Sequence, residues 1–268
     1  MIALQPRTDL LHTAPDDGLW LLTAFSQDDA LGVRFERIVE RKTGALHGLE
    51  ALCRVRNEDL PLQPHHLFRL AEEEECATEL SELMRRRAAA AMAVSTVRLF
   101  LNTHPAEFRD IPRLLYSLDE LRGCWPALRL VLEIHEEAEV SVLDLKILRR
   151  ELARMRIEMA YDDFGTGRGR LRELVEVPPD YLKIGYRVVQ SVRDARSSAR
   201  GVIQGLLRMA SSVGARVVAE GPESDLEQQA CWDLDFDLCQ RHDEPARDAG
   251  LVSVGSLMEE RPCLISCA

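Results

Sequence analysis

Short apolar runs recur along this chain, and most of them end at a polar side chain. Stretches with helical spacing and good helix formers separate the runs, and the clearest cover 71–94, 142–155, 199–213 and 223–233. Strands that alternate with helices predict a parallel sheet. The apolar runs are followed, in chain order, by Asn102, Glu133, Asp162, Lys183, Glu220 and Gln240.

The number of runs predicts a closed barrel. Two earlier runs, 33–39 and 46–53, bring the strand candidates to about eight, and a (β/α)8 barrel typically takes ~250 residues, which suits a chain of 268. Only 40–45 join these two runs, which is too short for a crossover helix, so they should pair as an antiparallel hairpin. We therefore expect a TIM-type (β/α)8 barrel with an antiparallel first strand over residues 30–268. Catalytic groups of such barrels lie at the carboxyl ends of the strands, where the polar residues fall.

Residues 1–29 precede the predicted barrel. Trp20 and Phe25 lie on an apolar face there, so we expect an N-terminal helical appendage that covers the barrel or meets a regulatory partner.

Two adjacent carboxylates end the run that begins at residue 157. Asp162 and Asp163 repel each other and are costly to bury unless a cation neutralises them, and Gly165 and Gly167 allow a tight turn beside a ligand. An Asp-rich turn that caps the next helix fits the same residues. The motif alone leaves both interpretations open.

Composition narrows the class of protein. A formal net charge of −11 argues against a basic face that clamps duplex nucleic acid, although a small phosphorylated ligand stays compatible with it. No run approaches the ~18 apolar residues of a membrane span, and the first residues do not resemble a signal peptide. Seven cysteines without CxxC pairs indicate reduced thiols. We expect a cytoplasmic protein without a membrane segment, in which the charged runs 72–75 and 85–87 form a solvated helix face.

The polar residues also carry a family resemblance between about residue 30 and residue 245. The chain resembles the EAL-domain family of cyclic di-GMP phosphodiesterases. The resemblance depends on an ordered series of motifs: Glu50-Ala51-Leu52, Phe100-Leu101-Asn102, Glu133-Ile134-His135-Glu136, Asp162-Asp163-Phe164-Gly165-Thr166-Gly167, Leu182-Lys183-Ile184 and Val217-Val218-Ala219-Glu220-Gly221-Pro222-Glu223.

The resemblance implies roles for individual positions. It implies two divalent ions, Mg²⁺ or Mn²⁺, and carboxylate and amide oxygens suit these metals better than zinc. Two cations can activate a water and stabilise the charge on a phosphodiester, and a lysine beside them could orient or deprotonate that water. The implied ligands of the first ion are Glu50, Asn102, Glu133 and Asp162, and those of the second are Asp162, Asp163 and Glu220.

Further positions match residues around the metals. Lys183 matches the lysine that contacts the attacking water, and Glu136 matches the glutamate that anchors the loop after Asp162-Asp163. The implied substrate contacts are Arg54, Gln240 and Glu223. Arg54 has the forked geometry that suits phosphate, and a structural salt bridge is the alternative for it.

The chain departs from the family pattern near the predicted site. Gly185 stands where the family usually has Asp, which removes a carboxylate, and Glu36-Arg37 replaces Gln-Pro. His135 replaces a threonine; it contacts the loop or the metals, or it only packs behind them. The other departures are Arg168-Gly169-Arg170 in the loop and Arg241-His242 after Gln240.

Three functions are compatible with these residues. The favoured one is metal-dependent hydrolysis of cyclic di-GMP to the linear dinucleotide, since the implied ligand set is retained. The departures favour an alternative, a catalytically inactive receptor for cyclic di-GMP or a protein-binding adaptor. A third discards the resemblance and makes Lys183 the base of a magnesium-dependent enolate-forming enzyme. The resemblance also implies a homodimer formed through the barrel's helices.

Overall fold

The structure is a computed structural model that describes residues 31–55, 64–167, 169–191, 199–222 and 225–245. The predicted appendage at 1–29, together with Arg168 and Glu223, lies outside the described residues.

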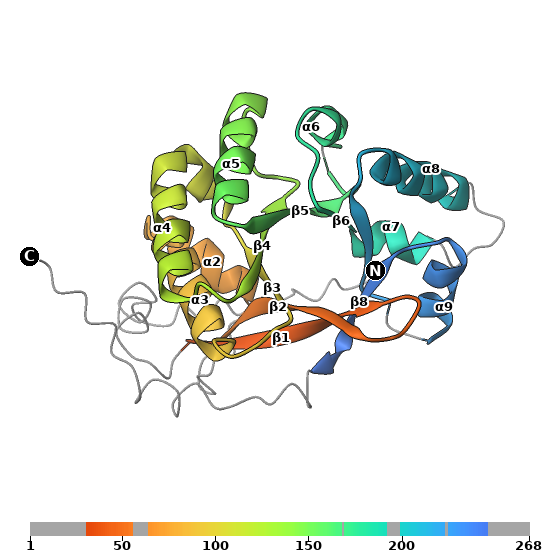
Figure 1. The fold of residues 1–268 in the computed structure, drawn as a ribbon, viewed down its shortest axis with the longest axis horizontal. Coiled ribbons are helices and arrows are strands. Elements are labelled where there is room, and N and C mark those ends of the chain that lie inside the picture. Colours follow the sequence, from red (N-terminus) through yellow and green to blue (C-terminus); the bar gives the residue numbers. More distant parts are fainter. Residues whose placement is uncertain (1–30, 56–63, 168, 192–198, 223–224, 246–268) are drawn as a thin grey trace, which may run out of the picture.

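Eight strands close into a barrel in chain order, β1 to β8 (Figure 1). β1 pairs antiparallel with both β2 and β8, and every later neighbour pair is parallel. The prediction of a (β/α)8-type barrel with an antiparallel first strand is confirmed. The strands are β1 (Leu31–Glu40), β2 (Leu46–Val55), β3 (Arg98–Asn102), β4 (Arg129–His135), β5 (Ile157–Phe164), β6 (Tyr181–Ile184), β7 (Arg216–Glu220) and β8 (Leu238–Pro245).

Helices surround the barrel and connect its parallel strands (Figure 1). None of the helices in the described part of the chain is long and apolar enough to cross a membrane. The helices are α2 (Pro64–Glu73), α3 (Ala77–Ala91), η1 (Pro105–Arg109), α4 (Ile111–Cys124), α5 (Val142–Arg154), α6 (Leu171–Glu176), α7 (Tyr186–Gln190), α8 (Ala199–Ser212) and α9 (Asp225–Asp233).

The single helix predicted over 71–94 is wrong in one respect, because two helices occupy this region. Glu75 adopts a φ of 55°, a left-handed conformation that ends a helix, and the Cys76 N–H bonds back to the Ala71 carbonyl at 2.7 Å. The first of the two helices also begins earlier than predicted, so that His65 lies in the first turn of α2.

The solvated helix face is confirmed for the acidic run 72–75 and for Arg86, which are exposed, and is wrong for the other two arginines of the basic run. Arg85 and Arg87 are only 3% and 5% exposed. Arg85 Nη1 donates to Glu107 Oε1 at 2.9 Å, and Arg87 donates to the Leu31 carbonyl. Periodicity shows which positions share a helix face, but the burial of that face depends on partners such as Glu107 that lie elsewhere in the sequence.

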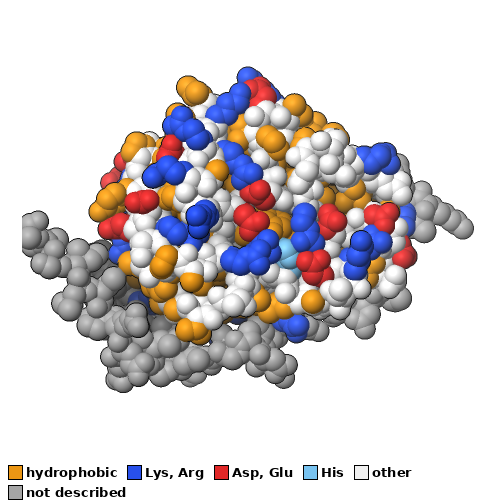
Figure 2. Space-filling view, viewed as in Figure 1, with side chains coloured by type: hydrophobic (Ala, Val, Ile, Leu, Met, Phe, Trp, Pro, Cys, Tyr) orange, Lys and Arg blue, Asp and Glu red, His pale blue; other side chains and the backbone are white. Residues whose placement is uncertain are grey.

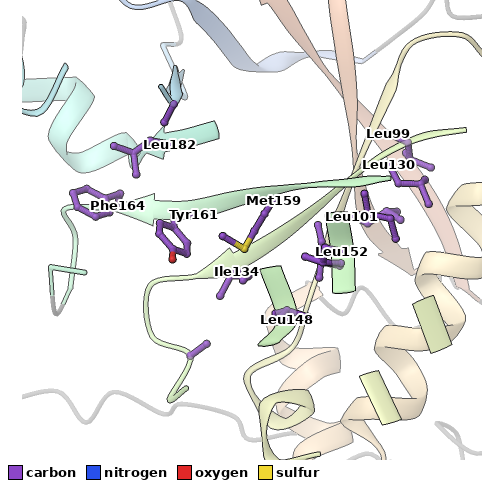
Figure 3. Close-up of a cluster of buried hydrophobic side chains, with 14 of the residues drawn as sticks. Leu99, Leu101, Leu130, Ile134, Leu148, Leu152, Met159, Tyr161, Phe164 and Leu182 are labelled. Carbon is purple, nitrogen blue, oxygen red and sulfur yellow. The ribbon is translucent and has the colours of Figure 1, made fainter. Parts of the chain in front are cut away.

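Strand residues alternate between two apolar layers. The outward-facing residues pack against the helices, and Figure 3 shows part of this layer, including Leu101, Ile134, Met159 and Tyr161. The inward-facing residues form a separate cluster that fills the middle of the barrel. Its members come from seven of the strands: Ile38, Phe100, Val131, Ala160, Tyr181, Val218 and Leu238.

The same alternation places polar residues at the two ends of the barrel interior. Because a strand returns to the same face every second residue, the position two residues beyond each central residue also faces inward. On β3 to β8, that position is the polar residue noted in the sequence: Asn102, Glu133, Asp162, Lys183, Glu220 and Gln240. The apolar middle of the barrel therefore supports a polar layer at its carboxyl-terminal mouth.

Candidate metal centre at the barrel mouth

Lys183 lies at the centre of the polar layer. Its side chain is 1% exposed, and β6 carries it inward from Tyr181 in the middle of the barrel. Four carboxylates from four other strands surround its ammonium group. The distances from Lys183 Nζ are 2.9 Å to Glu50 Oε2, 2.7 Å to Glu133 Oε1, 2.8 Å to Asp162 Oδ1 and 2.8 Å to Glu220 Oε1.

The protonation equilibria of this cluster reflect a shortage of positive charge. Burial and the neighbouring Glu50 carboxylate raise the pKa of Glu133 well above its usual range, and burial likewise raises the pKa of Glu220. Burial alone would lower the pKa of Lys183, but the surrounding carboxylates, Asp162 foremost, outweigh it and raise that pKa well above its ordinary value. Burial opposes ionisation of Asp162 too, yet the Lys183 ammonium keeps the pKa of Asp162 low. One ammonium is thus insufficient for the surrounding carboxylates.

The donor atoms fit a divalent cation. Oxygen atoms predominate, and buried Glu133 Oε2 has no hydrogen-bond partner among the described residues. Asn102 adds an amide and donates from Nδ2 to Glu50 Oε1 at 2.8 Å. Among the residues that the structure describes, no group of three His, Cys, Asp or Glu side chains is arranged to hold a metal by itself. We attribute this to Lys183, on which the carboxylates converge.

Gln240 and Glu36 extend the cluster toward β1. Gln240 is 2% exposed, and its Nε2 donates to Glu50 Oε2 at 2.6 Å and to Glu36 Oε2 at 3.0 Å. Glu36 is itself 1% exposed, so it is a further buried acid at the mouth. Sequence reasoning treated Glu36 only as a departure from a family pattern. Its position two residues before Ile38 on an inward-facing register was the signal that could have placed it in the site.

Asp163 lies apart from the group around Lys183. Its Oδ2 is 3.6 Å from His135 Nε2, and both side chains are about one-third exposed. The nearby imidazole of His135 is the main reason that the pKa of Asp163 is lowered, and the Asp163 carboxylate in turn raises the pKa of His135. The structure therefore places the predicted ligand Asp163 beside His135, at the rim of the mouth.

Glu136 ties the loop after β5 to the end of β4. It is 1% exposed, and its Oε2 accepts the backbone N–H groups of Thr166 at 3.1 Å and Gly167 at 2.6 Å. Its Oε1 accepts the N–H of Gly169 at 2.6 Å. A buried carboxylate with several backbone donors fixes the loop conformation, because each donor would otherwise lack a partner.

A cavity opens from the mouth toward α2. Its volume is about 1160 Å³, which is ample for a small-molecule ligand, and its wall includes Arg54, Asn102, His104 and His135. Arg54 is exposed there, and no ion pair to it occurs among the described residues. The structural salt bridge considered for Arg54 is thus not seen in the part of the chain that the structure describes.

Comparison with known proteins supports one family. The model of the EAL domain matches residues 20–240. The cyclic di-GMP phosphodiesterase NbdA of Pseudomonas aeruginosa is 28% identical over 211 residues, which are 74% of this chain and 26% of NbdA. The probable cyclic di-GMP phosphodiesterase PdeN of Escherichia coli is 28% identical over 232 residues, which are 80% of this chain and 42% of PdeN. The chain thus spans less than half the length of these curated relatives.

Solved structures share the fold. The PaMucR phosphodiesterase, in complex with c-di-GMP, superposes with a TM-score of 0.75 at 22% identity over 85% of this chain and 96% of its own. The EAL domain of FimX from Pseudomonas aeruginosa, bound to c-di-GMP, gives a TM-score of 0.75 at 20% identity over 84% of this chain and 93% of its own. The matching family model and the barrel with its antiparallel first strand agree, and this chain belongs to the EAL domain family.

Proposed function

We propose that this protein hydrolyses cyclic di-GMP to the linear dinucleotide with two divalent metal ions, Mg²⁺ or Mn²⁺, bound at the barrel mouth. The relatives named as cyclic di-GMP phosphodiesterases and the neighbours solved with c-di-GMP support the substrate. The observation that carries the proposal is the buried group of four carboxylates around the single ammonium of Lys183. Such a group destabilises the folded state unless a cation binds it.

The ligand set follows from the positions in the barrel. Glu50, Asn102, Glu133, Asp162 and Glu220 would hold the ions at the mouth, and Asp163 would contribute from the rim. When bound, two divalent ions activate a water and stabilise the negative charge that develops on the phosphodiester.

The surrounding residues bind and orient the substrate. Arg54 presents an exposed guanidinium to the cavity beside Asn102, where it can take a phosphate oxygen pair in its forked donors. Gln240 Oε1 is buried without a hydrogen-bond partner among the described residues, so it can accept a bond from a bound ligand or water. Glu223 lies outside the described residues and stays a predicted substrate contact.

Lys183 acts as a hydrogen-bond donor in this account. The surrounding carboxylates raise its pKa well above the ordinary value, and its Nζ donates to Glu50 Oε2 at 2.9 Å, so the side chain can orient a nucleophilic water or a phosphate oxygen. Bound divalent cations would lower this pKa, so deprotonation of the water stays the alternative role of Lys183.

The direct test is chromatographic. The purified protein is incubated with cyclic di-GMP in magnesium, in manganese and in chelator, and the linear dinucleotide is quantified. We expect product only with metal, and we expect Glu50→Gln to abolish it, because Glu50 meets Asn102, Lys183 and Gln240 together. The matched control is Glu120→Gln, which removes a surface contact to Arg86 on the helices and should leave turnover unchanged.

Two results would contradict the proposal. Turnover that persists in Glu50→Gln would remove the metal centre from the mechanism. Binding of cyclic di-GMP without any metal-dependent product would instead make the protein a receptor, the function that Gly185 and Glu36 favour.

A further inference from the structure

The backbone at Gly185 is approached very closely by another side chain. A Cβ atom at this position would lie 1.9 Å from Asp163 Oδ1 and 2.6 Å from Thr166 Cγ2, so no side chain fits there while Asp163 keeps its place. The φ of Gly185 is −61°, which any residue can adopt. The glycine is therefore required for the space that it leaves to Asp163 and not for its own backbone conformation.

His135 lies near the other oxygen of the same carboxylate. Its Nδ1 accepts the backbone N–H of Glu137 at 3.2 Å, and an imidazole nitrogen that accepts carries no proton. The ring proton must then be on Nε2, which lies 3.6 Å from Asp163 Oδ2. This tautomer directs a donor, and not a metal-binding lone pair, at Asp163.

The backbone of Asp163 is fixed as well. Its φ of 55° is in the left-handed region, which is uncommon for a residue other than glycine. Thr166 Oγ1 donates to the Asp163 carbonyl at 2.9 Å, and Thr166 is in turn held by Glu136. The direction of the Asp163 side chain is thus set by its own backbone, by His135 and by the gap at Gly185.

We propose that His135 and Gly185 together position the Asp163 carboxylate at the barrel mouth, in the space that a side chain at residue 185 would otherwise fill. Asp163 thereby supplies there the carboxylate that the sequence lacks at 185. His135 is a positioning residue, since it acts through Asp163 and contacts none of the four carboxylates around Lys183 within the distances found for ion pairs. The inference rests on the metal centre of the proposed function.

The proposed position of the Asp163 carboxylate can be tested by removing it from residue 163 and introducing a carboxylate at residue 185. Manganese binding is measured by titration calorimetry, a readout independent of turnover. We expect Asp163→Ala to weaken manganese binding at least about tenfold, and His135→Ala and Gly185→Ala to weaken it roughly tenfold, as usual for residues that orient a ligand. The triple variant Asp163→Ala/Thr166→Ser/Gly185→Asp should recover most of the loss, because serine removes the methyl group 2.6 Å from the new Cβ, which itself lies 1.9 Å from the former place of Asp163 Oδ1.

Matched variants separate positioning from general damage to the fold. His135→Gln keeps a side-chain donor and should stay within about threefold of the unchanged protein. Asp163→Ala/Thr166→Ser/Gly185→Ala fills the same space with a methyl group instead of a carboxylate, so its manganese binding should stay weak. Melting curves in chelator show whether each variant is folded.

Each outcome decides the proposal. A triple variant with aspartate at 185 that binds manganese no better than Asp163→Ala overturns the relocation of the carboxylate. Equal affinities for His135→Ala and the unchanged protein overturn the role of His135. If the unchanged protein binds manganese and all these variants bind it equally well, only this inference is wrong. If the unchanged protein binds no manganese, the metal centre and the proposed function are wrong too.

Discussion

The two ends of the barrel interior carry similar side chains, but acidic and basic groups are paired at one end and acidic groups are in excess at the other. At the amino-terminal end, each acid of the inner layer faces an arginine: Arg98 Nε lies 2.7 Å from Glu158 Oε2, and Arg216 Nη2 lies 2.9 Å from Glu40 Oε2. At the mouth, four carboxylates share the one ammonium of Lys183. Both groups lie two residues away from the same central layer, one toward each end of the strands.

The difference separates a structural use of charge from a functional one. Paired charges satisfy each other and call for no ligand, and Figure 2 shows acidic and basic side chains interspersed over the face seen in that view. A buried group of carboxylates with too few cations destabilises the fold. Such groups are typical of sites that bind a ligand or a metal ion. The imbalance at the mouth, and not the mere presence of acids, therefore identifies the site.

The largest expected effect comes from removing the internal cation at the mouth. Lys183→Met should lower the free energy of unfolding in chelator by about 3–5 kcal/mol, because it leaves buried carboxylates without their partner. Magnesium or manganese should restore part of this loss by binding in its place. Urea unfolding with chelator and with metal measures both effects.

The amino-terminal end supplies the matched control. Arg98→Met breaks a partly exposed ion pair with Glu158, so it should lower the free energy of unfolding by roughly 1 kcal/mol. This loss should be the same in chelator and in metal. A metal-dependent loss in Arg98→Met, or an unchanged stability of Lys183→Met in chelator, would remove the distinction between the two ends.

A smaller effect concerns pH at the amino-terminal end. Burial lowers the pKa of His47 below 6.5, so the folded protein binds fewer protons there than the unfolded chain does. The stability that neutral His47 contributes is present above pH 6.5 and is lost as the pH falls through and below that value. We expect His47→Asn to lose less stability than the unchanged protein when urea unfolding is compared at pH 7.5 and pH 5.5.

The control for this prediction is an exposed histidine. His65 lies on the surface of α2, so His65→Asn should follow the pH dependence of the unchanged protein. If the stability of His47→Asn has the same pH dependence as that of the unchanged protein, His47 is not the group that titrates at this end.

The strand pattern was sufficient to predict the barrel and its mouth. A period of two residues determines which side chains face inward, so polar residues that end successive runs must meet where parallel strands end together. For that reason the strand pattern alone could place Asn102, Glu133, Asp162 and Lys183 at one mouth, whereas Glu50, which lies inside the run 46–53, was assigned only through the family resemblance. The antiparallel first strand followed from the short connection at 40–45.

What the sequence could not give depends on contacts between distant residues. The break between α2 and α3 and the burial of Arg85 depend on backbone geometry at Glu75 and on Glu107 of η1. The reason for a glycine at 185 became visible only in the structure, where a Cβ atom at this position would lie 1.9 Å from Asp163 Oδ1. Backbone conformations and contacts of this kind leave no repeating pattern in a single sequence.

The most direct test of the charge imbalance is to count protons when metal binds. Because the pKa values of Glu133 and Glu220 are raised, the metal-free mouth retains protons that a divalent cation must displace. Manganese titrations at pH 7 in two buffers of different ionisation enthalpy measure this number. The account predicts a saturable binding heat that differs between the buffers through proton release; equal heats in the two buffers, or no binding, would contradict it.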